Sequence, residues 1–411
     1  MFKRPVWGQR TASRVLVPGT PLLPPFPPAR PHLPAHRDVI VVGGGVTGCA
    51  ATYHLASAGA EVLLLEQFDL NTQASGRNAG SLHGQIQHEP FLHLGEEWAR
   101  SFLPALAMLV DSVGIWQHLS DQLGVDLEVS TPGGLLIAET NEQMRDIERK
   151  VAIEREAGLV VELLGPDDLQ RLAPYVSEQM IGGELSRVEG KANSLLAAPA
   201  FARAAARLGA KVETYVEVTG VDTDPRGFRL RTSAGATTCR RLVLTAGTNL
   251  RGLGAMLGRN LPITAEPVQV SVTETVAPLV KHLVYFAGEK LTLKQARSGS
   301  LLIGGGWPAR TGPSGTPVMN PQSLRANLRV AQKVVPAVGG AQLLRTWVGV
   351  GNGTPDQRPV LGELSGLPGL VVGMFPYMGL TAGPLMGLLV ADLVLGRDPG
   401  RDLQPFRPDR F

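Results

Sequence analysis

The residues with the clearest chemical meaning are three glycines near the start of the chain. Gly43, Gly45 and Gly48 form a G-x-G-x-x-G pattern directly after an apolar run. In such a turn the first glycine permits the sharp bend, the second lets the backbone approach a pyrophosphate, and the third allows a helix to pack closely on a strand. The first residues of that helix, Val46 and Thr47, would present backbone N–H groups to the anion. The pattern predicts a dinucleotide site.

An acidic residue stands where the ribose of such a dinucleotide would lie. Glu66 ends the next apolar run, 61-EVLLLE-66, and follows Gly48 by 18 residues. A carboxylate at this place can accept hydrogen bonds from a ribose diol. It disfavours a ribose phosphate, so NADP is not expected. Strand, glycine turn, helix, strand and acid together argue against a turn without a ligand.

The polar loop 74-ASGRNAGSLHGQ-85 narrows the choice of dinucleotide. A nicotinamide enzyme does not need small polar residues at this point, whereas a flavin has a ribityl chain and a planar ring that need backbone donors beside them. Arg77 and Asn78 can add donors toward a phosphate or the ring edge. The loop therefore favours FAD, with predicted contacts at Ser75, Gly76, Arg77, Asn78, Ala79 and Gly80.

The elements that position these residues alternate between strand and helix. A strand over 38–43, a helix over 47–58 and a strand over 61–66 open a doubly wound sheet. Similar segments return in the middle and at the end of the chain, at 241–247, 369–374 and 380–395. Between these segments lie strands in which apolar and polar residues alternate. The same regions include a helix over 91–123, broken at Pro104, and a strand over 211–218.

This pattern predicts an α/β protein with two domains. A discontinuous Rossmann-like FAD-binding domain would comprise residues 37–100, 190–262 and 340–411. An antiparallel-sheet α+β substrate domain would comprise residues 101–189 and 263–339.

Composition excludes several classes of function. The 411 residues carry a formal net charge of +3, and no basic block alternates with aromatic residues, so a nucleic-acid partner is not expected. The two cysteines, Cys49 and Cys239, form no CxxC or His/Cys cluster, so neither a metal site nor an iron–sulfur cluster is expected in this chain. No apolar run reaches the ~18 residues of a membrane helix. We expect a soluble protein of the cytoplasm without an integral membrane span, in which Cys49 fills apolar space.

Residues 1–36 differ from the rest, with nine prolines and no acidic residue. Proline lacks the backbone N–H and interrupts helices. A disordered tail and an over-extended start are favoured over a targeting peptide, and the domain is expected to start near Arg37.

Four stretches of the chain resemble the D-amino acid oxidase (DAO) family of flavoproteins. This family includes glycine and sarcosine oxidases, D-amino acid dehydrogenases, and subunits of opine and hydroxyproline dehydrogenases. The stretches are 39–66, the S-G-R-N-A-G loop at 75–80, 243–250, and the C-terminal pair 354–363 and 373–387. The family's A-x-G strand end matches Ala246 and Gly247. Its T-P-D-x-x-P-x-x-G box matches Thr354, Pro355, Asp356, Pro359 and Gly362.

The resemblance implies that FAD lies extended, with the flavin ring against the antiparallel sheet. Some relatives tether the flavin through histidine or cysteine, but His83 and His88 do not match those positions well, so non-covalent binding is expected. Val216 or Val218 would contact the adenine through backbone groups. The N-terminus of helix 380–395 would point at the N1–C2=O edge of the flavin, where its positive end stabilises the charge that forms when N5 accepts hydride. The contacts implied there are Met378, Gly379, Leu380 and Thr381.

The chain departs from the family where many relatives grip the substrate carboxylate. Relatives that oxidise amino acids carry an arginine where Gly351 and Asn352 stand here, and a second one where this chain offers Tyr377. A weakly charged substrate, a replacement basic residue, or a chain that does not oxidise substrate alone would each explain this. Replacement candidates are Lys290, Lys294 and Arg297, and Trp307 could wall the pocket. The predicted catalytic residues are Lys294, Tyr377 and Trp307.

The function predicted from the sequence is oxidation of a small amine or amino-acid-like substrate to an imine, by hydride transfer to flavin N5. Substrates in view are a D-amino acid, an N-substituted amino acid, hydroxyproline or an opine. Two alternatives stay open: a FAD-carrying electron-transfer or scaffold subunit, and a flavin enzyme of another reaction type. The resemblance makes iron–sulfur or flavoprotein partner subunits plausible.

Overall fold

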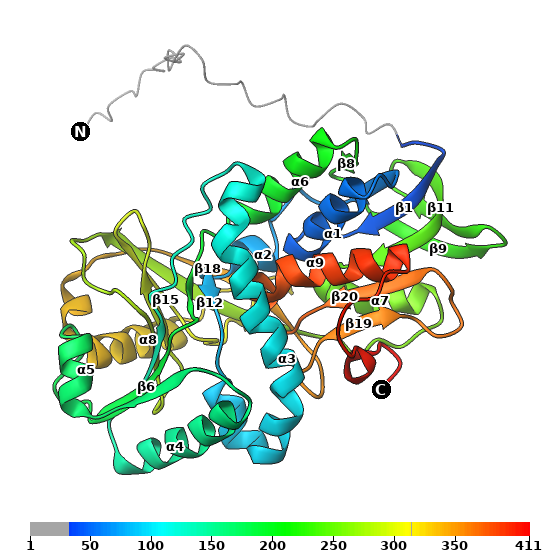
Figure 1. Cartoon of the computed structure of the whole chain (residues 1–411). Helices are drawn as coiled ribbons and strands as arrows, with labels where there is room; N and C mark the ends of the chain where they lie inside the picture. Colours follow the sequence, from blue (N-terminus) through cyan, green and yellow to red (C-terminus); the bar gives the residue numbers. More distant parts are fainter. Residues whose placement is uncertain (1–32, 314) are drawn as a thin grey trace, which may run out of the picture.

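A computed structural model describes residues 33–313 and 315–411 of the chain. Two eight-stranded sheets form the two halves of the molecule, and helix α3 runs between them (Figure 1). The predicted α/β class, with one mainly parallel and one mainly antiparallel sheet, is confirmed. The helices are α1 (Val46–Ser57), α2 (Ala74–Arg77), α3 (His88–Leu123), α4 (Asn141–Glu156), α5 (Pro166–Leu172), α6 (Ala197–Arg207), α7 (Leu250–Met256), α8 (Pro321–Val334) and α9 (Gly379–Leu395).

The first sheet carries the glycine turn. Its order is β19-β20-β11-β1-β2-β8, in which β20, β11, β1, β2 and β8 run parallel, while β19 and the β9–β10 hairpin pair antiparallel. Val39 and Val41 of β1 pack into the core beneath α1, α6 and α9, whereas Ile40 and Val42 pack into the core on the opposite face. Because both faces are buried, the strand appears in the sequence as an uninterrupted apolar run.

The strands of this sheet are β1 (His36–Val42), β2 (Val62–Leu65), β8 (Lys211–Glu213), β9 (Val218–Asp224), β10 (Gly227–Thr232), β11 (Gly235–Leu244), β19 (Val360–Glu363) and β20 (Leu370–Met374). Two short pairs lie outside the large sheets: β3 (Ser81–Leu82) with β7 (Gly190–Lys191), and β16 (Arg310–Thr311) with β17 (Pro317–Val318).

The second sheet has the order β18-β12-β15-β14-β13-β4-β6-β5, and its neighbouring strands are antiparallel except β13 and β4, which are parallel. Helix α8 covers one face, where Val330 and Val334 pack against Leu293 and Ile303. The other face is turned toward the first sheet. The strands are β4 (Gly134–Ala138), β5 (Val161–Leu164), β6 (Gly182–Ser186), β12 (Thr264–Thr275), β13 (Leu283–Phe286), β14 (Thr292–Gln295), β15 (Ser300–Gly304) and β18 (Leu343–Gly353).

Helix α3 connects the two halves. Ser112 Oγ and Trp116 Nε1 donate hydrogen bonds to the carbonyl oxygen of Thr381 in α9, at 2.6 and 3.0 Å. By length and composition α3 is the one helix in the described residues that could cross a membrane, and half of its most apolar stretch is buried inside the molecule. Its contacts with α9 and α4 are those of a core helix.

Three expectations about elements differ from the structure. The backbone of α3 leaves helical geometry at Gly95 (φ 79°) and not at Pro104. The strand expected over 211–218 stops at Glu213, because Tyr215 has a positive φ of 60° that breaks the extended run. Residues 343–353, expected with the FAD-binding part, pair with β12 in the second sheet. The pairing partner of a strand is set by tertiary structure, which its own sequence does not reveal.

The expectations for the N-terminal extension fall mostly outside the described residues. β1 begins at His36, one residue before the predicted start of the domain. The carbonyl oxygen of Ala35 accepts a hydrogen bond from the backbone N–H of Thr238 at 3.1 Å.

Candidate functional site

The glycine turn lies between the end of β1 and the start of α1. Gly43 has φ +114°, and a Cβ added to it would lie 2.7 Å from the carbonyl oxygen of Thr245. Gly48 packs even more closely, since an added Cβ would collide with the carbonyl oxygen of Gly43. The N-cap residue of α1, Gly45, has no side chain that could cap the helix. Apart from the N–H groups of Gly44 and Val46, which Glu66 and Ser75 engage, the turn leaves its backbone N–H groups open to an anion.

Glu66 is held firmly at the end of β2. Its Oε2 accepts the N–H of Gly44 at 2.7 Å and its Oε1 accepts the N–H of Phe68 at 2.9 Å. The carboxylate lines the cavity beside the glycine turn. Each oxygen keeps a lone pair, so the group can still accept hydrogen bonds from a ribose diol.

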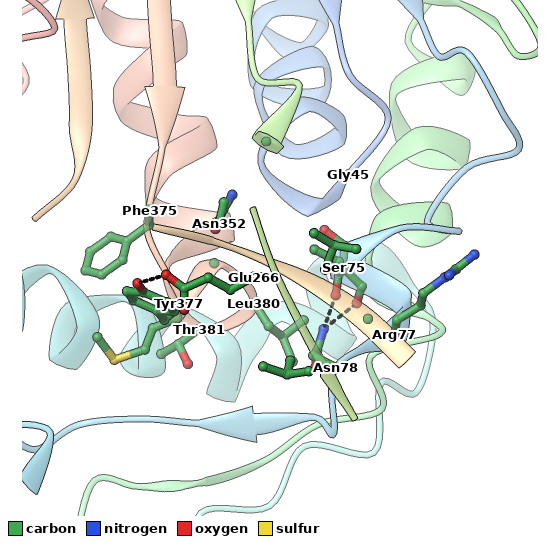
Figure 2. A pocket seen from close by; sticks show the side chains of 18 of the residues that line it. Gly45, Ser75, Arg77, Asn78, Glu266, Asn352, Phe375, Tyr377, Leu380 and Thr381 are labelled. Atoms are coloured by element: carbon green, nitrogen blue, oxygen red, sulfur yellow. Dashed lines mark hydrogen bonds between the residues drawn. The ribbon is translucent and has the colours of Figure 1, made fainter. Parts of the chain in front are cut away.

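The loop over 74–80 is organised by its own polar side chains. Asn78 Nδ2 donates to the carbonyl oxygens of Ala74 and Ser75 at 3.0 and 2.6 Å, and its Oδ1 accepts the N–H of Gly80 at 2.8 Å (Figure 2). Ser75 Oγ accepts the N–H of Val46 at 3.1 Å, which ties the loop to α1. These side chains shape the loop, and small residues leave space for a ligand.

Arg77 also binds backbone. Its Nε donates to the carbonyl oxygen of Thr72 at 2.6 Å and its Nη1 to that of Val348 at 3.3 Å. In Figure 2 the guanidinium is directed away from Tyr377. The donors that the sequence assigned to a phosphate or ring edge therefore serve loop conformation in this structure.

The N-terminus of α9 faces the same cavity. Thr381 Oγ1 accepts the N–H of His83 at 3.0 Å and donates to the carbonyl oxygen of Ser81 at 3.3 Å. In the part of the chain that the structure describes, no side chain caps this helix. The remaining predicted contacts that line the cavity are Val216, Val218, Ala246, Gly247, Met378, Gly379 and Leu380.

One continuous cavity of about 1270 Å³ joins these parts. It runs from the glycine turn and Glu66, past the loop over 74–80 and the start of α9, to the face of the second sheet. Ligand pockets usually measure about 300–1000 Å³, so this one can hold a dinucleotide with space beside it. The open turn of α1, the carboxylate of Glu66 and the uncapped start of α9 fit FAD.

The second sheet contributes a polar wall that sequence reasoning missed. The Tyr285 hydroxyl donates to Glu189 Oε1 at 3.2 Å and lies 2.8 Å from His83 Nδ1. Glu189 Oε1 and Oε2 also accept the N–H of Gly84 and the side-chain amide of Gln85, both at 2.7 Å. Because the tyrosine proton is given to the carboxylate, His83 carries its own proton on Nδ1, and Nε2 is left as an acceptor.

Burial sets the charge state of this wall. It lowers the pKa of His83 to about 3, with Lys294 contributing, and raises the pKa of Glu189 from 4.5 to about 7. The imidazole is therefore neutral at physiological pH. His83 and Tyr285 line the cavity, whereas Glu189 supports them from behind. His83, Tyr285 and Glu189 come from three separate segments of the chain. The one available signal in the sequence was that side chains alternate in direction along a strand, which could have indicated that Tyr285 faces the cavity.

The three predicted catalytic residues occupy different places. Tyr377 lines the cavity and its hydroxyl donates to Glu266 Oε1 at 2.8 Å. Lys294 is buried behind the cavity wall, where Nζ donates to Ser81 Oγ at 2.8 Å, and burial lowers its pKa from 10.5 to about 7. Trp307 packs at the edge of the α8 core and donates to the carbonyl oxygen of Lys290 at 2.7 Å. Lys294 and Trp307 therefore reach the cavity only through other residues.

The other candidate cations are already paired. Lys290 lines the cavity but its Nζ lies 2.8 Å from Glu89 Oε1, and Arg297 forms an ion pair with Asp126. Gly351 and Asn352, where many relatives carry an arginine, both line the cavity. In the described residues no group of three His, Cys, Asp or Glu side chains could hold a metal ion. Cys49 is buried, and burial raises its pKa, as expected for apolar filler.

Comparisons with known proteins agree on one family. The sequence model of the FAD dependent oxidoreductase (DAO) family matches residues 38–393. Glycine oxidase from Geobacillus kaustophilus is 30% identical over 382 residues, which cover 90% of this chain and 96% of that protein. Sarcosine oxidase subunit beta from Rhizobium meliloti is 26% identical over 401 residues, which cover 93% of this chain and 90% of that protein. The crystal structure of the Geobacillus glycine oxidase superposes with a TM-score of 0.81 at 26% identity, covering 92% of this chain and 100% of that one.

Proposed function

Because this chain belongs to the DAO family of FAD-dependent oxidoreductases, we propose that it oxidises a small amine or amino-acid-like substrate to the imine. FAD is its cofactor, and the relatives named above are a glycine oxidase and a subunit of a sarcosine oxidase. The substrates in view are a D-amino acid, an N-substituted amino acid, hydroxyproline or an opine.

The observation that supports this proposal is the continuity of the cavity. The glycine turn, the start of α9 and the polar wall of the second sheet all line one space. A dinucleotide extended from the turn would place its reactive ring between α9 and that wall. When bound, FAD supplies a hydride acceptor at N5.

The chain's own residues would bind and orient the substrate amine. Oxidation at the carbon next to nitrogen requires a neutral amine, and a buried site favours the neutral form because desolvation disfavours charge. Neutral His83 offers an acceptor for an amine N–H, and Tyr285 and Glu189 hold its ring. Leu136 and Val270 supply apolar surface on the same wall and limit access of water.

Individual contacts remain part of the proposal. The proposed FAD contacts are those assigned from the sequence. The most important of them are the contacts made by Glu66 and by the first turns of α1 and α9. Among the predicted catalytic residues Tyr377 has direct access to the cavity, whereas Lys294 would act by positioning Ser81. We include a cytoplasmic location, which the two buried free cysteines fit.

A second candidate function is that of a FAD-carrying subunit whose electrons pass to a partner. The replacement of the family arginines by Gly351, Asn352 and Tyr377 favours it. The relative from Rhizobium meliloti is itself named as a subunit. We therefore keep an iron–sulfur or flavoprotein partner within the proposal.

Anaerobic mixing of the purified yellow protein with a panel of amines tests the proposal. The panel holds D-amino acids, N-methyl amino acids, D-hydroxyproline and opines, and bleaching of the flavin absorbance is followed. Bleaching by an amine supports amine oxidation. Bleaching by none of them, with FAD firmly bound, favours the subunit without its own oxidation, and bleaching by hydroxy acids favours another reaction type.

A further inference from the structure

The outer end of the cavity contains a carboxylate without a cation. Glu266, Tyr377 and Asn352 line this end (Figure 2). Oε1 of Glu266 accepts the hydroxyl groups of Tyr377 at 2.8 Å and Thr264 at 3.3 Å. Among the described residues no donor engages its Oε2, and no Lys, Arg or His forms an ion pair with it.

Backbone geometry holds the tyrosine against this carboxylate. Tyr377 has a φ of 55°, which is uncommon for a residue with a side chain. Its N–H donates to the carbonyl oxygen of Asn352 at 3.0 Å. A Cβ at Gly353 would collide with the Tyr377 hydroxyl, so a glycine there is needed for this arrangement. Strained residues kept in place by their surroundings concentrate at functional sites.

The electrostatic environment of this end is negative. Burial raises the pKa of Tyr377 to about 12, and the charges of Glu266 and Glu89 contribute. The cations of the cavity lining are engaged elsewhere, since Lys290 pairs with Glu89 and Arg77 binds backbone carbonyls. A carboxylate ligand at this end would therefore face Glu266 with no cation to offset the repulsion.

The inner end lies some distance away across an apolar strip. Glu266, Val268 and Val270 all line the cavity, as alternate residues of β12 do when they share one face of a sheet. Four residues along a strand span about 13 Å. Tyr285 lies on β13, which β15 and β14 separate from β12 in the sheet, so Glu266 and the wall that contains Tyr285 and His83 line different parts of the cavity.

We propose that the substrate carries a second, cationic nitrogen that binds Glu266, joined by an apolar chain to the nitrogen-bearing carbon that is oxidised. Its chemical class is a basic amino acid or a diamine. Glu266 supplies a charged acceptor, and Tyr377 fixes its orientation. This inference rests on the proposed function, because it names the substrate class of the same cavity.

Matched ligands that differ only in the second nitrogen test this inference. The yellow protein with FAD bound is titrated calorimetrically with 1,5-diaminopentane and with n-pentylamine. The anaerobic rate of flavin bleaching is measured with racemic lysine and racemic norleucine. A charge-assisted hydrogen bond predicts a preference of about tenfold for the ligand with two nitrogens. Glu266→Gln should remove the preference while FAD content stays the same.

Glu274→Gln is the matched control. Glu274 lies on the same strand outside the cavity lining, and its Oε1 accepts the N–H of Gln342 at 3.0 Å, a bond that the amide oxygen of glutamine can replace. This variant should keep the preference.

Equal binding of the two amines, or a preference that survives in Glu266→Gln, overturns the inference even when amines bleach the flavin. Conversely, Glu266-dependent binding of 1,5-diaminopentane without any bleaching supports the cation site and contradicts amine oxidation.

Discussion

Among single residues, Tyr285 is central to the polar wall of the cavity, because it links His83 to Glu189. Its hydroxyl forms hydrogen bonds with both His83 and Glu189. Tyr285→Phe should lower kcat/KM about tenfold for the best amine found in the panel, because the imidazole loses the partner that fixes its tautomer and angle. FAD content should not change. Steady-state kinetics of the yellow protein check this.

The same variant should change how stability depends on pH. Burial raises the pKa of Glu189 from 4.5 to about 7, and the Tyr285 hydrogen bond opposes this rise. A carboxyl with a raised folded pKa contributes stability below pH 4.5 and loses it as pH rises through about 7. Tyr285→Phe should therefore destabilise the protein more at pH 8 than at pH 5, in urea unfolding. Tyr53→Phe, outside the cavity lining, serves as control; equal loss at both pH values would contradict the assignment.

Lys294 should affect the pH dependence of the free energy of unfolding in the opposite direction. Burial, together with Lys191, lowers its pKa from 10.5 to about 7. A lysine with a lowered folded pKa contributes stability above pH 10.5 and loses it as pH falls through about 7. Lys294→Met should flatten the rise in the free energy of unfolding between pH 7 and pH 10. The free energy of unfolding from denaturant titrations at three pH values measures this slope.

Steady-state kinetics of Lys294→Met show whether Lys294 acts directly in catalysis or only positions Ser81. If Lys294 acts only by positioning Ser81, the variant should retain its pH profile of kcat while KM changes. A kcat that loses a pH-dependent limb near pH 7 would instead assign a direct role.

Residues whose roles depend on local sequence were predictable, and those whose roles depend on distant partners were not. The roles of Gly43 and Glu66 follow from one turn and the strand after it, so their spacing reveals them. The cluster of Tyr285, His83 and Glu189 joins positions up to 202 residues apart. No local pattern marks such a cluster.

At the scale of elements, the turn between β1 and α1 is the part on which FAD binding depends. Gly43→Ala should abolish retention of FAD, because φ +114° is strained for alanine and its Cβ would lie 2.7 Å from the carbonyl oxygen of Thr245. The flavin absorbance per protein after gel filtration measures retention. Gly252→Ala in α7, where an added Cβ meets nothing within 4 Å, is the control and should keep its yellow colour. A yellow Gly43→Ala protein would disprove the role of this turn.

Elements with a strong local signal were predicted to within two residues, as α1 and α9 show. The missed features depend on backbone conformation. Gly95 interrupts α3 because glycine adopts a positive φ easily, whereas Pro104 continues the helix. The assignment of β18 failed for another reason, since its hydrogen bonds go to β12 and not to a neighbour in sequence.

At the scale of the whole molecule, the cavity exists only because two sheets made of interrupted segments face each other. Beside the second sheet lies a buried ionic group formed by Lys150 and Glu154 of α4 and Glu184 of β6, each with 0% side-chain exposure. Lys150 Nζ lies 2.7 Å from Glu154 and 2.8 Å from Glu184, and it donates to Gln85 Oε1 at 3.2 Å. Glu154 Oε1 in turn accepts the N–H of Ile86 at 2.6 Å.

This group ties the second sheet to the segment that follows the flavin loop, so its loss should affect both stability and cofactor retention. Lys150→Met leaves two carboxylates buried without a cation, which costs about 3–5 kcal/mol. In urea, the loss of far-UV circular dichroism and the release of FAD fluorescence should shift together to lower concentration. Lys333→Met, which removes a partly exposed ion pair with Glu139, should cost at most about 1 kcal/mol.

A triple variant separates charge burial from packing. Replacing Lys150 by Met and both Glu154 and Glu184 by Leu removes every charge of the group, so much of the lost stability should return. FAD retention should recover less, because the triple variant removes the partners of the Ile86 N–H and of Gln85 Oε1. If FAD leaves Lys150→Met at the wild-type urea concentration while the circular dichroism midpoint falls, the two halves unfold independently and the proposed tie between them is wrong.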